Sequence, residues 1–166
     1  DPNHTASGGA AELKNRGISV DIGLLKEEAR NLNRRFYTFH EKKRPYIILK
    51  YASTLDGFIA QENKVSKWIT NHKSRSLNHS TRTSSDAILI GSSTAIHDNP
   101  NLGSHGKGKD PKIIVIDPEN KLNEMIDIFH KDPIVYSNSE LASNRSDNVS
   151  FILNDLFRRN IQSVLV

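Results

Sequence analysis

The sequence predicts an α/β fold with a mixed or mainly parallel sheet. Short runs rich in β-branched residues recur along the chain, for example at Ala87–Ile90, Lys112–Ile116 and Ser163–Val166, and segments with helical character separate them. Strands that alternate with helices are typical of a parallel sheet covered by helices. The sequence contains no internal repeat.

Composition restricts the class of protein. A chain of 166 residues suits one domain, or one domain with part of another. Hydrophobic residues make up 36%, and the mean hydropathy of −0.56 predicts a modest core. The net charge of +4 suits an anionic ligand such as a phosphorylated metabolite or a dinucleotide, and is too diffuse to indicate nucleic acid. Without cysteine there is no disulfide or thiolate site, and no apolar run is long enough to span a membrane.

The N-terminal quarter is typical of the end of a preceding domain. We predict a helix at Ala10–Asn15, a strand at Ile18–Ile22, a helix at Leu24–Phe39 and a linker at Glu41–Arg44. So few elements cannot bury a core of their own. The opening Asp-Pro-Asn-His is not a signal peptide and lacks an initiator methionine, so we expect a soluble cytoplasmic protein and a segment of a longer chain.

The stretch from Arg44 to Ala60 is the segment around which we expect the rest of the chain to be arranged. Tyr46–Leu49 is predicted to be a strand buried on both faces, and small or polar side chains follow from Ala52 to Thr54. Asp56-Gly57 predicts a turn into a second strand-like run. Because α/β sheets bind ligands beyond the carboxyl ends of their strands, we expect a ligand site here.

The remaining elements are predicted from local patterns. Asn71–Thr83 is predicted to be a helix, although Leu77 is nearly its only large apolar residue. A brief helix begins at Thr94 and stops at Asn99-Pro100. The other elements predicted are strands at Ile134–Tyr136 and Ser150–Ile152 and a helix at Asn154–Asn160.

The order of these motifs resembles one known family. Arg-Pro-Tyr, Leu-Lys, the serine two positions before Leu-Asp-Gly, and a later Trp-Ile-Thr resemble the opening of the reductase domain of the bacterial riboflavin-biosynthesis bifunctional deaminase/reductase. Asp1-Pro2-Asn3 and Gly17-Ile18-Ser19-Val20 resemble the last segment of that family's deaminase domain. The resemblance implies a dihydrofolate-reductase-like domain at residues 43–166, truncated before an expected Glu-Gly-Gly motif. It also implies the tail of a deaminase-like α/β domain and a linker at residues 1–42.

The resemblance also implies an activity. The expected reaction is reduction of 5-amino-6-(5-phosphoribosylamino)uracil by NADPH to the 5-phosphoribitylamino product, in a protein expected to be a homodimer. The zinc deaminase motifs His-x-Glu and Pro-Cys-x-x-Cys are absent, so we expect no deaminase activity and no metal in this chain. Two alternatives stay open: a related reductase with another substrate, and a non-catalytic binding module.

Site residues follow from the same resemblance, and each has an ordinary structural alternative. A lone tryptophan is more often part of a core, a threonine near a helix start can be a cap, and a loop leucine needs no function. The resemblance implies that Lys50 is catalytic; that Ser66, Arg82, Leu102 and His105 bind substrate; and that Ala52, Trp68, Thr94 and Asp98 bind the cofactor.

Two positions depart from the family pattern. His105 stands where the family has an arginine, which weakens the expected affinity for phosphate. Pro118 stands where a cofactor-binding serine is common, which removes a hydroxyl and an N–H donor. The Gly103–Lys109 loop lacks the strand-to-helix context of a phosphate-binding P-loop, and we expect it to be flexible. His97 beside Asp98 has no second histidine at helical spacing to complete a metal site.

Overall fold

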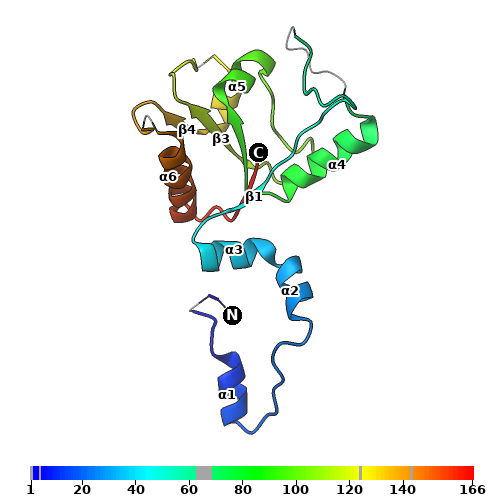
Figure 1. Cartoon of the computed structure of the whole chain (residues 1–166), viewed down its shortest axis with the longest axis vertical. Coiled ribbons are helices and arrows are strands. Elements are labelled where there is room, and N and C mark those ends of the chain that lie inside the picture. Colours follow the sequence, from blue (N-terminus) through cyan, green and yellow to red (C-terminus); the bar gives the residue numbers. More distant parts are fainter. Residues whose placement is uncertain (1, 4, 63–68, 124, 143) are drawn as a thin grey trace. The chain divides into compact units, whose positions relative to one another are not determined.

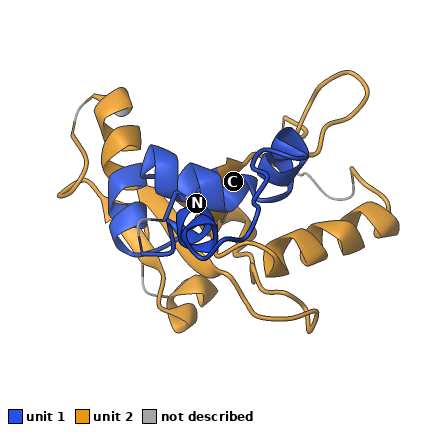
Figure 2. Ribbon diagram, turned by 90° about the horizontal axis from the view of Figure 1, so that it is seen from below, with its two compact units in different colours: residues 1–46, 153–162 blue, residues 47–152, 163–166 orange. Residues whose placement is uncertain are grey.

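The structure is a computed structural model that describes residues 2–3, 5–62, 69–123, 125–142 and 144–166. The chain divides into two compact units, which Figure 2 shows in different colours. Unit 1 comprises residues 1–46 and 153–162, and unit 2 comprises residues 47–152 and 163–166. The strands are drawn as arrows in Figure 1, and the sheet lies almost entirely in unit 2.

Unit 1 contains three N-terminal helices: α1 (Gly9–Asn15), α2 (Lys26–Leu32) and α3 (Arg34–Lys42). The single helix predicted from Leu24 to Phe39 is wrong, because the helix is interrupted at Asn33. The side-chain amide and the backbone N–H of Asn33 both donate to the Ala29 carbonyl, at 3.0 and 3.1 Å, and so close the end of α2. The helix α3 then continues to Lys42, which shortens the predicted linker.

The strand predicted at Ile18–Ile22 is also wrong. The structure forms no strand there, and the side chains of Ile18 and Ile22 are 50% and 75% exposed. The described residues offer this segment no neighbouring strand, so its alternating pattern has no sheet face to bury. The packing in unit 1 centres instead on Phe39, which is buried and lies 4.7 Å from the Phe157 ring.

The sheet of five strands has the order β1-β5-β2-β3-β4. The pairs β2–β3, β2–β5 and β3–β4 are parallel, which confirms the α/β fold class. Val166 donates to the Ile48 carbonyl and Lys50 donates to the Val166 carbonyl, both at 2.9 Å, so β1 runs in the same direction as β5. The strands are β1 (Tyr46–Ile48), β2 (Ala87–Gly91), β3 (Lys112–Asp117), β4 (Ile134–Ser137) and β5 (Ser163–Leu165).

The predicted strand at Tyr46–Leu49 exists as β1, but burial on both faces is wrong. In the described sheet β1 has β5 as its one neighbour and is an edge strand. The side chains of Ile47 and Leu49 are accordingly 36% and 70% exposed. The predicted turn at Asp56-Gly57 is present, since Gly57 has φ +88° and donates to the Thr54 carbonyl at 3.0 Å. The second strand predicted after it is wrong, because residues 58–62 form no strand.

Four helical segments accompany the strands: α4 (His72–Thr83), α5 (Ser92–Asp98), the 3₁₀ helix η1 (Asp127–Lys131) and α6 (Arg145–Arg158). In Figure 1, α4 and α6 lie on opposite sides of the sheet. The side chain of Asn71 caps α4 by accepting from the Ser74 N–H at 3.0 Å. The predicted strand at Ser150–Ile152 is wrong, because these residues lie within α6, where Ile152 and Leu156 share one buried helix face.

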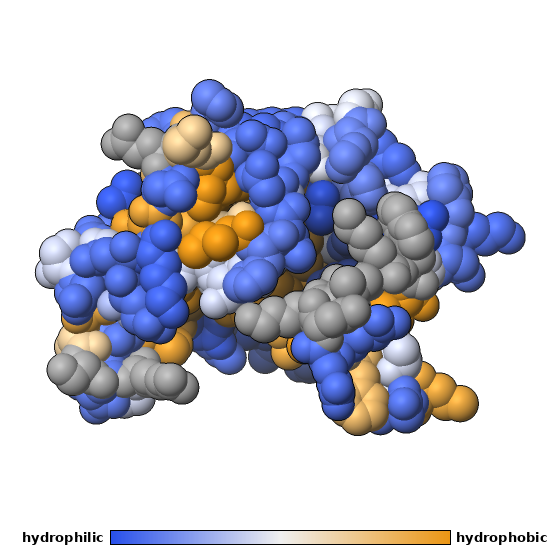
Figure 3. Space-filling model, turned by 90° about the horizontal axis from the view of Figure 1, so that it is seen from above, coloured by the Kyte–Doolittle hydropathy of each residue, from blue (hydrophilic) through white to orange (hydrophobic). Residues whose placement is uncertain are grey.

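The core of unit 2 forms between the central strands and the segments that follow them. Its buried cluster comprises Ile88, Ala95, Leu102, Ile113, Val115, Ile126, Ile128 and Leu165. Apolar side chains also reach the surface, as the orange areas in Figure 3 show. Within the described part of the chain, no helix combines the length and the apolar character needed to span a bilayer.

Candidate functional site

Some of the predicted site residues follow the carboxyl ends of neighbouring strands. Lys50 and Ala52 follow β1, Thr94 and Asp98 belong to α5 after β2, and Pro118 follows β3. Because these strands are parallel, their carboxyl ends meet the same edge, where open α/β sheets bind ligands.

A cavity of about 440 Å³ opens after β1. It brings together three predicted site residues, Lys50, Ala52 and Arg82, and adds Arg75 and His79 from α4. No acidic side chain is among the described residues that line it, so its charge favours an anion. Its lining residues are Lys50, Tyr51, Ala52, Ile59, Ile69, Thr70, Arg75, Asn78, His79 and Arg82.

The helix α4 contributes a polar face to this cavity. Arg75, Asn78, His79 and Arg82 are three or four residues apart, which places them on one side of a helix. Sequence reasoning missed Arg75, Asn78 and His79, although this spacing was the signal that could have found them. Leu77 lies outside the lining and is 69% exposed.

Arg82 combines burial with incomplete hydrogen bonding. Its Nη1 donates to the Gly103 carbonyl at 3.3 Å. Its Nε is buried and has no partner among the described residues, and the same is true of Asn78 Oδ1. Burial lowers the pKa of Arg82, but an arginine starts so high that it stays charged at neutral pH. A partly buried cation with a free donor is equipped to bind an anionic ligand.

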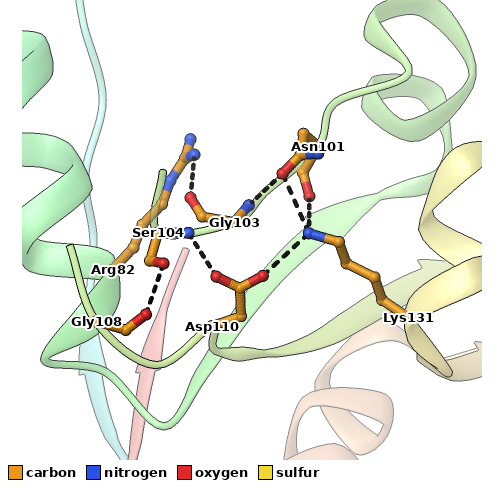
Figure 4. A network of polar contacts seen from close by, with 7 residues as sticks. All are labelled: Arg82, Asn101, Gly103, Ser104, Gly108, Asp110 and Lys131. Carbon is orange, nitrogen blue, oxygen red and sulfur yellow. Dashed lines mark hydrogen bonds and ion pairs between the residues drawn. The ribbon is translucent and has the colours of Figure 1, made fainter. Parts of the chain in front are cut away.

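The carbonyl that Arg82 contacts belongs to a hydrogen-bonded loop, shown in Figure 4. The backbone N–H of Ser104 donates to Asp110 at 2.8 Å, and the Gly103 N–H donates to Asn101 Oδ1 at 3.1 Å. Lys131 joins the two, since its Nζ lies 3.2 Å from Asp110 Oδ2 and 3.1 Å from Asn101 Oδ1. The loop that positions the Gly103 carbonyl is therefore fixed at several points.

Asp110 is the anionic centre of this network. The hydrogen bond from the Ser104 backbone N–H, together with Lys131, lowers the pKa of Asp110 to about 2. The Ser104 hydroxyl also donates to the Gly108 carbonyl at 2.7 Å, and Gly103 and Ser104 are buried. Hydrogen bonds thus hold the first part of the Gly103–Lys109 loop, which we expected to be flexible.

Two histidines meet beside the cavity. The rings of His79 and His105 lie 4.1 Å apart, so His105 is next to a residue of the lining although it does not line the cavity itself. The pKa of His79 is lowered, mainly by burial. Electrostatic repulsion from His105, Arg82, Lys107 and Arg75 lowers it further. Lys107 also donates to the Ser76 carbonyl at 3.0 Å, which joins this loop to α4.

Leu102 is part of the core. Its side chain is 5% exposed, its φ is +55°, and it packs in the buried cluster of unit 2. The alternative of an exposed loop leucine is therefore wrong. Contact between Leu102 and a substrate stays a prediction, and it would have to use the backbone.

The other predicted site residues are not gathered in this cavity. Thr94 and Asp98 are exposed on α5, which begins at Ser92, two residues earlier than predicted. Ser66 and Trp68 lie outside the described residues. His97 Nδ1 donates to the Ser93 carbonyl at 2.7 Å, and the described residues contain no cluster suited to a metal ion.

A second cavity, of about 550 Å³, lies after β3 and β4. Pro118, the departure noted in the sequence, is one of its lining residues. Asp117 shapes this turn: burial would raise its pKa, but hydrogen bonds from the Leu122 and Lys121 N–H groups and from Ser92 outweigh burial and lower it. The lining comprises Ile116, Pro118, Glu119, Asn138, Leu141, Ala142, Asn148, Val149 and Ile152.

Comparison with known proteins assigns the family. The model of the RibD C-terminal domain matches residues 45–166. The chain belongs to the RibD C-terminal domain family. RibD of Aquifex aeolicus is 46% identical over 122 residues, which are 72% of this chain and 34% of that protein. RibD of Actinobacillus pleuropneumoniae is 43% identical over 121 residues, 72% of this chain and 32% of that protein.

Solved RibD structures share the fold. A deaminase/5-amino-6-(5-phosphoribosylamino)uracil reductase from Thermotoga maritima has a TM-score of 0.88 and 38% identity, and the match covers 100% of this chain and 51% of that one. Acinetobacter baumannii RibD, form 1, has a TM-score of 0.80 and 28% identity over 99% of this chain and 51% of that one. The chain therefore spans about a third of its curated RibD relatives and about half of the solved ones. It covers RibD reductase-domain sequence with a dihydrofolate-reductase-like fold, which confirms the resemblance.

Proposed function

We propose that this chain supplies part of a reductase that uses NADPH to convert 5-amino-6-(5-phosphoribosylamino)uracil to its 5-phosphoribitylamino product. The observation that carries the proposal is the cavity after β1, in which Lys50, Arg75 and Arg82 present positive charge and no described acidic side chain opposes them. Such a lining suits the phosphate of the substrate. The reductase activity in the name of the Thermotoga maritima protein supports the same substrate class.

Within this proposal Arg82 binds the phosphate and Lys50 orients the sugar. The buried Arg82 Nε has no partner in the described residues, so binding an oxyanion there costs no existing hydrogen bond. Lys50 is exposed beside the same cavity and can hydrogen-bond a sugar hydroxyl. Leu102 contributes through its backbone, and Ser66 completes the substrate contacts. His105, whose ring lies 4.1 Å from that of His79, adds a further substrate contact.

The edge of the sheet suits an extended dinucleotide. The cavity after β1 and the one after β3 are three strand spacings apart, roughly 14 Å. The second cavity combines apolar Ile116 and Ile152 with polar Asn138, which suits a nucleoside. A reduced nicotinamide bound beside Ala52, in the cavity after β1, would supply hydride to the first carbon of the opened sugar. The residues that would hold the cofactor are Ala52, Trp68, Thr94 and Asp98.

The proposal extends to the organisation of the protein. We assign residues 1–42 to the tail of a deaminase-like domain and residues 43–166 to the N-terminal part of the reductase domain. The start of the family match at residue 45 supports this boundary. A homodimer and a cytoplasmic location belong to the same proposal.

Fluorescence titration and a turnover assay test the proposal. NADPH and NADH are titrated into this chain and into the complete protein that carries it, and reduction of the phosphoribosylamino substrate is followed by loss of NADPH absorbance. We expect NADPH to bind the complete protein and Arg82→Ala to abolish reduction while NADPH affinity is kept. Lys73→Ala is the matched control, because it removes a positive charge from α4 at an exposed position outside the cavity lining.

The outcomes separate the alternatives. NADPH binding without turnover of this substrate would favour a related reductase with another substrate. Failure of NADPH to bind the complete protein would favour a non-catalytic module. Equal losses from Arg82→Ala and Lys73→Ala would attribute the effect to general charge and remove Arg82 from the site.

A further inference from the structure

We infer that Asn78 is a ligand-binding residue of the cavity after β1 and acts as a pair with Arg82. The inference rests on the proposed function, because it assigns a residue to the same site. Asn78 and Arg82 are four residues apart on α4, so their side chains leave the helix on the same face. Both line the cavity.

The first argument is the unmet hydrogen bonding of this pair. Asn78 Oδ1 and Arg82 Nε are both buried, and neither has a partner in the part of the chain that the structure describes. A buried polar atom without a partner destabilises a folded protein, whereas a leucine of similar size would carry no such cost. A half-turn of the amide would place Nδ2 at the same position, so a polar group stays unpaired in either orientation.

The second argument is chemical complementarity. The Asn78 carbonyl accepts a hydrogen bond, and the Arg82 guanidinium donates one and carries positive charge. Together they match a ligand that presents an O–H or N–H beside an anionic group. A sugar phosphate has this arrangement in its hydroxyls, and the proposed substrate adds the amino groups of its pyrimidine.

The cationic side chains of the lining cannot take the role of acceptor. The Arg75 guanidinium already donates to the Thr70 carbonyl at 2.6 Å. Lys50 and Arg82 are donors without acceptor atoms in their side chains. Asn78 therefore brings a side-chain acceptor to a lining dominated by donors.

Two substitutions at Asn78 test the inference in the complete protein that carries this sequence. Asn78→Leu keeps the volume and removes the polar atoms. Asn78→Asp places a carboxylate four residues before Arg82, the favourable order for an ion pair on a helix, and so occupies the Arg82 guanidinium. Thermal unfolding is measured without ligand, and affinity is measured for ribose 5-phosphate and for the whole phosphoribosylamino substrate. Leu77→Ala is the control, because Leu77 is the adjacent α4 residue, is exposed and lies outside the lining.

Opposite effects on stability and affinity are expected. Both Asn78 variants should unfold at an equal or higher temperature than the parent, while affinity falls about tenfold, as loss of one hydrogen bond to a charged ligand predicts. A fall for ribose 5-phosphate assigns the contact to a sugar hydroxyl. A fall for the whole substrate alone assigns it to the pyrimidine amino groups. Both results support the inference.

Other results would overturn it. If affinity for both ligands is unchanged in Asn78→Asp, the amide has no binding role, whatever happens to stability. If Asn78→Leu unfolds at a lower temperature, Asn78→Asp decides: retained affinity would make Asn78 a structural residue. Failure of the parent protein to bind either ligand would overturn the inference as well. Ligand binding without NADPH-dependent turnover would contradict the proposed function. The affinity measurements would then still decide whether Asn78 binds the ligand.

Discussion

The backbone carbonyl of Gly103 accepts a hydrogen bond from Nη1 of Arg82 at 3.3 Å, which joins the loop after α5 to the helix that lines the cavity. A side chain at Gly103 would crowd the loop at this contact. A Cβ atom at Gly103 would lie 2.7 Å from Asn101 Oδ1 and 3.1 Å from Lys131 Nζ. These atoms belong to side chains, so a side chain at Gly103 would force Asn101 and Lys131 to shift.

Gly103→Ala should therefore displace the loop and weaken the Arg82 contact. We expect the free energy of unfolding to fall by about 1–3 kcal/mol, the usual cost of overpacking, in urea titrations followed by circular dichroism. Gly9→Ala is the control, because a Cβ there meets no atom within 4 Å. Equal stability of the Gly103→Ala variant and the parent would show that the loop has room to relax.

Asp110 should make stability depend on acid. The folded pKa of about 2 is below the ordinary value of 3.8, so the unfolded chain binds this proton more readily. The stabilisation is complete above the ordinary value and is lost as pH falls from about 4 towards 2. Asp110→Asn should lower the free energy of unfolding at pH 7 by about 1 kcal/mol, a small value because the carboxylate is half-exposed. Denaturant titrations at pH 7, 4 and 2.5 should show the two proteins converging in acid, and a constant difference would contradict this explanation.

Leu102 should behave as a core residue. Because its side chain is buried in the cluster of unit 2, Leu102→Ala should reduce the free energy of unfolding by about 2–4 kcal/mol, measured by denaturant titration. Leu102→Met keeps most of the volume and should cost less than about 1.5 kcal/mol. A Leu102→Ala variant of unchanged stability but reduced substrate affinity would assign the side chain to the site instead.

His79 should make phosphate binding depend on pH. Burial and nearby cations lower the pKa of His79 in the folded protein. As pH falls through the ordinary value of about 6.5, the unfolded chain binds this proton more readily than the folded protein, so the fold loses stability. A phosphate in the cavity favours the protonated ring, so binding takes up a proton. We expect affinity for ribose 5-phosphate, measured by calorimetry, to fall less steeply from pH 6.5 to 8 in His79→Gln than in the parent. Parallel pH profiles would show that His79 does not sense the ligand.

His105→Arg should strengthen phosphate binding. The ring of His105 lies 4.1 Å from that of His79, so an arginine here would add a permanent charge beside the cavity. We expect affinity for ribose 5-phosphate at pH 7.5 to rise several-fold, with a larger gain at low salt. Lys109→Arg, which keeps the charge of an exposed residue in the same loop, is the control. A gain that does not depend on salt would argue against an electrostatic cause.

Local sequence patterns were sufficient to predict the helices and strands whose own residues mark their ends or their burial. The cap residue Asn71 marked the start of α4, Asn99-Pro100 marked the end of α5, and the apolar runs of β2 and β3 were recognisable as buried strands. Ser150–Ile152 was misassigned because a short apolar run does not distinguish a strand from one buried turn of a helix.

The sequence by itself determined the α/β class and the family, because both depend on the order of short motifs along the chain. Only the tertiary structure decided that β1 is an edge strand, that Leu102 is buried, and that Asn78 shares the cavity with Arg82. Burial and hydrogen bonding depend on which distant segments meet, and residue types alone do not specify those contacts. The described structure brings the Gly103 carbonyl, twenty-one residues along the chain, to Arg82, and it leaves two polar atoms of α4 without partners.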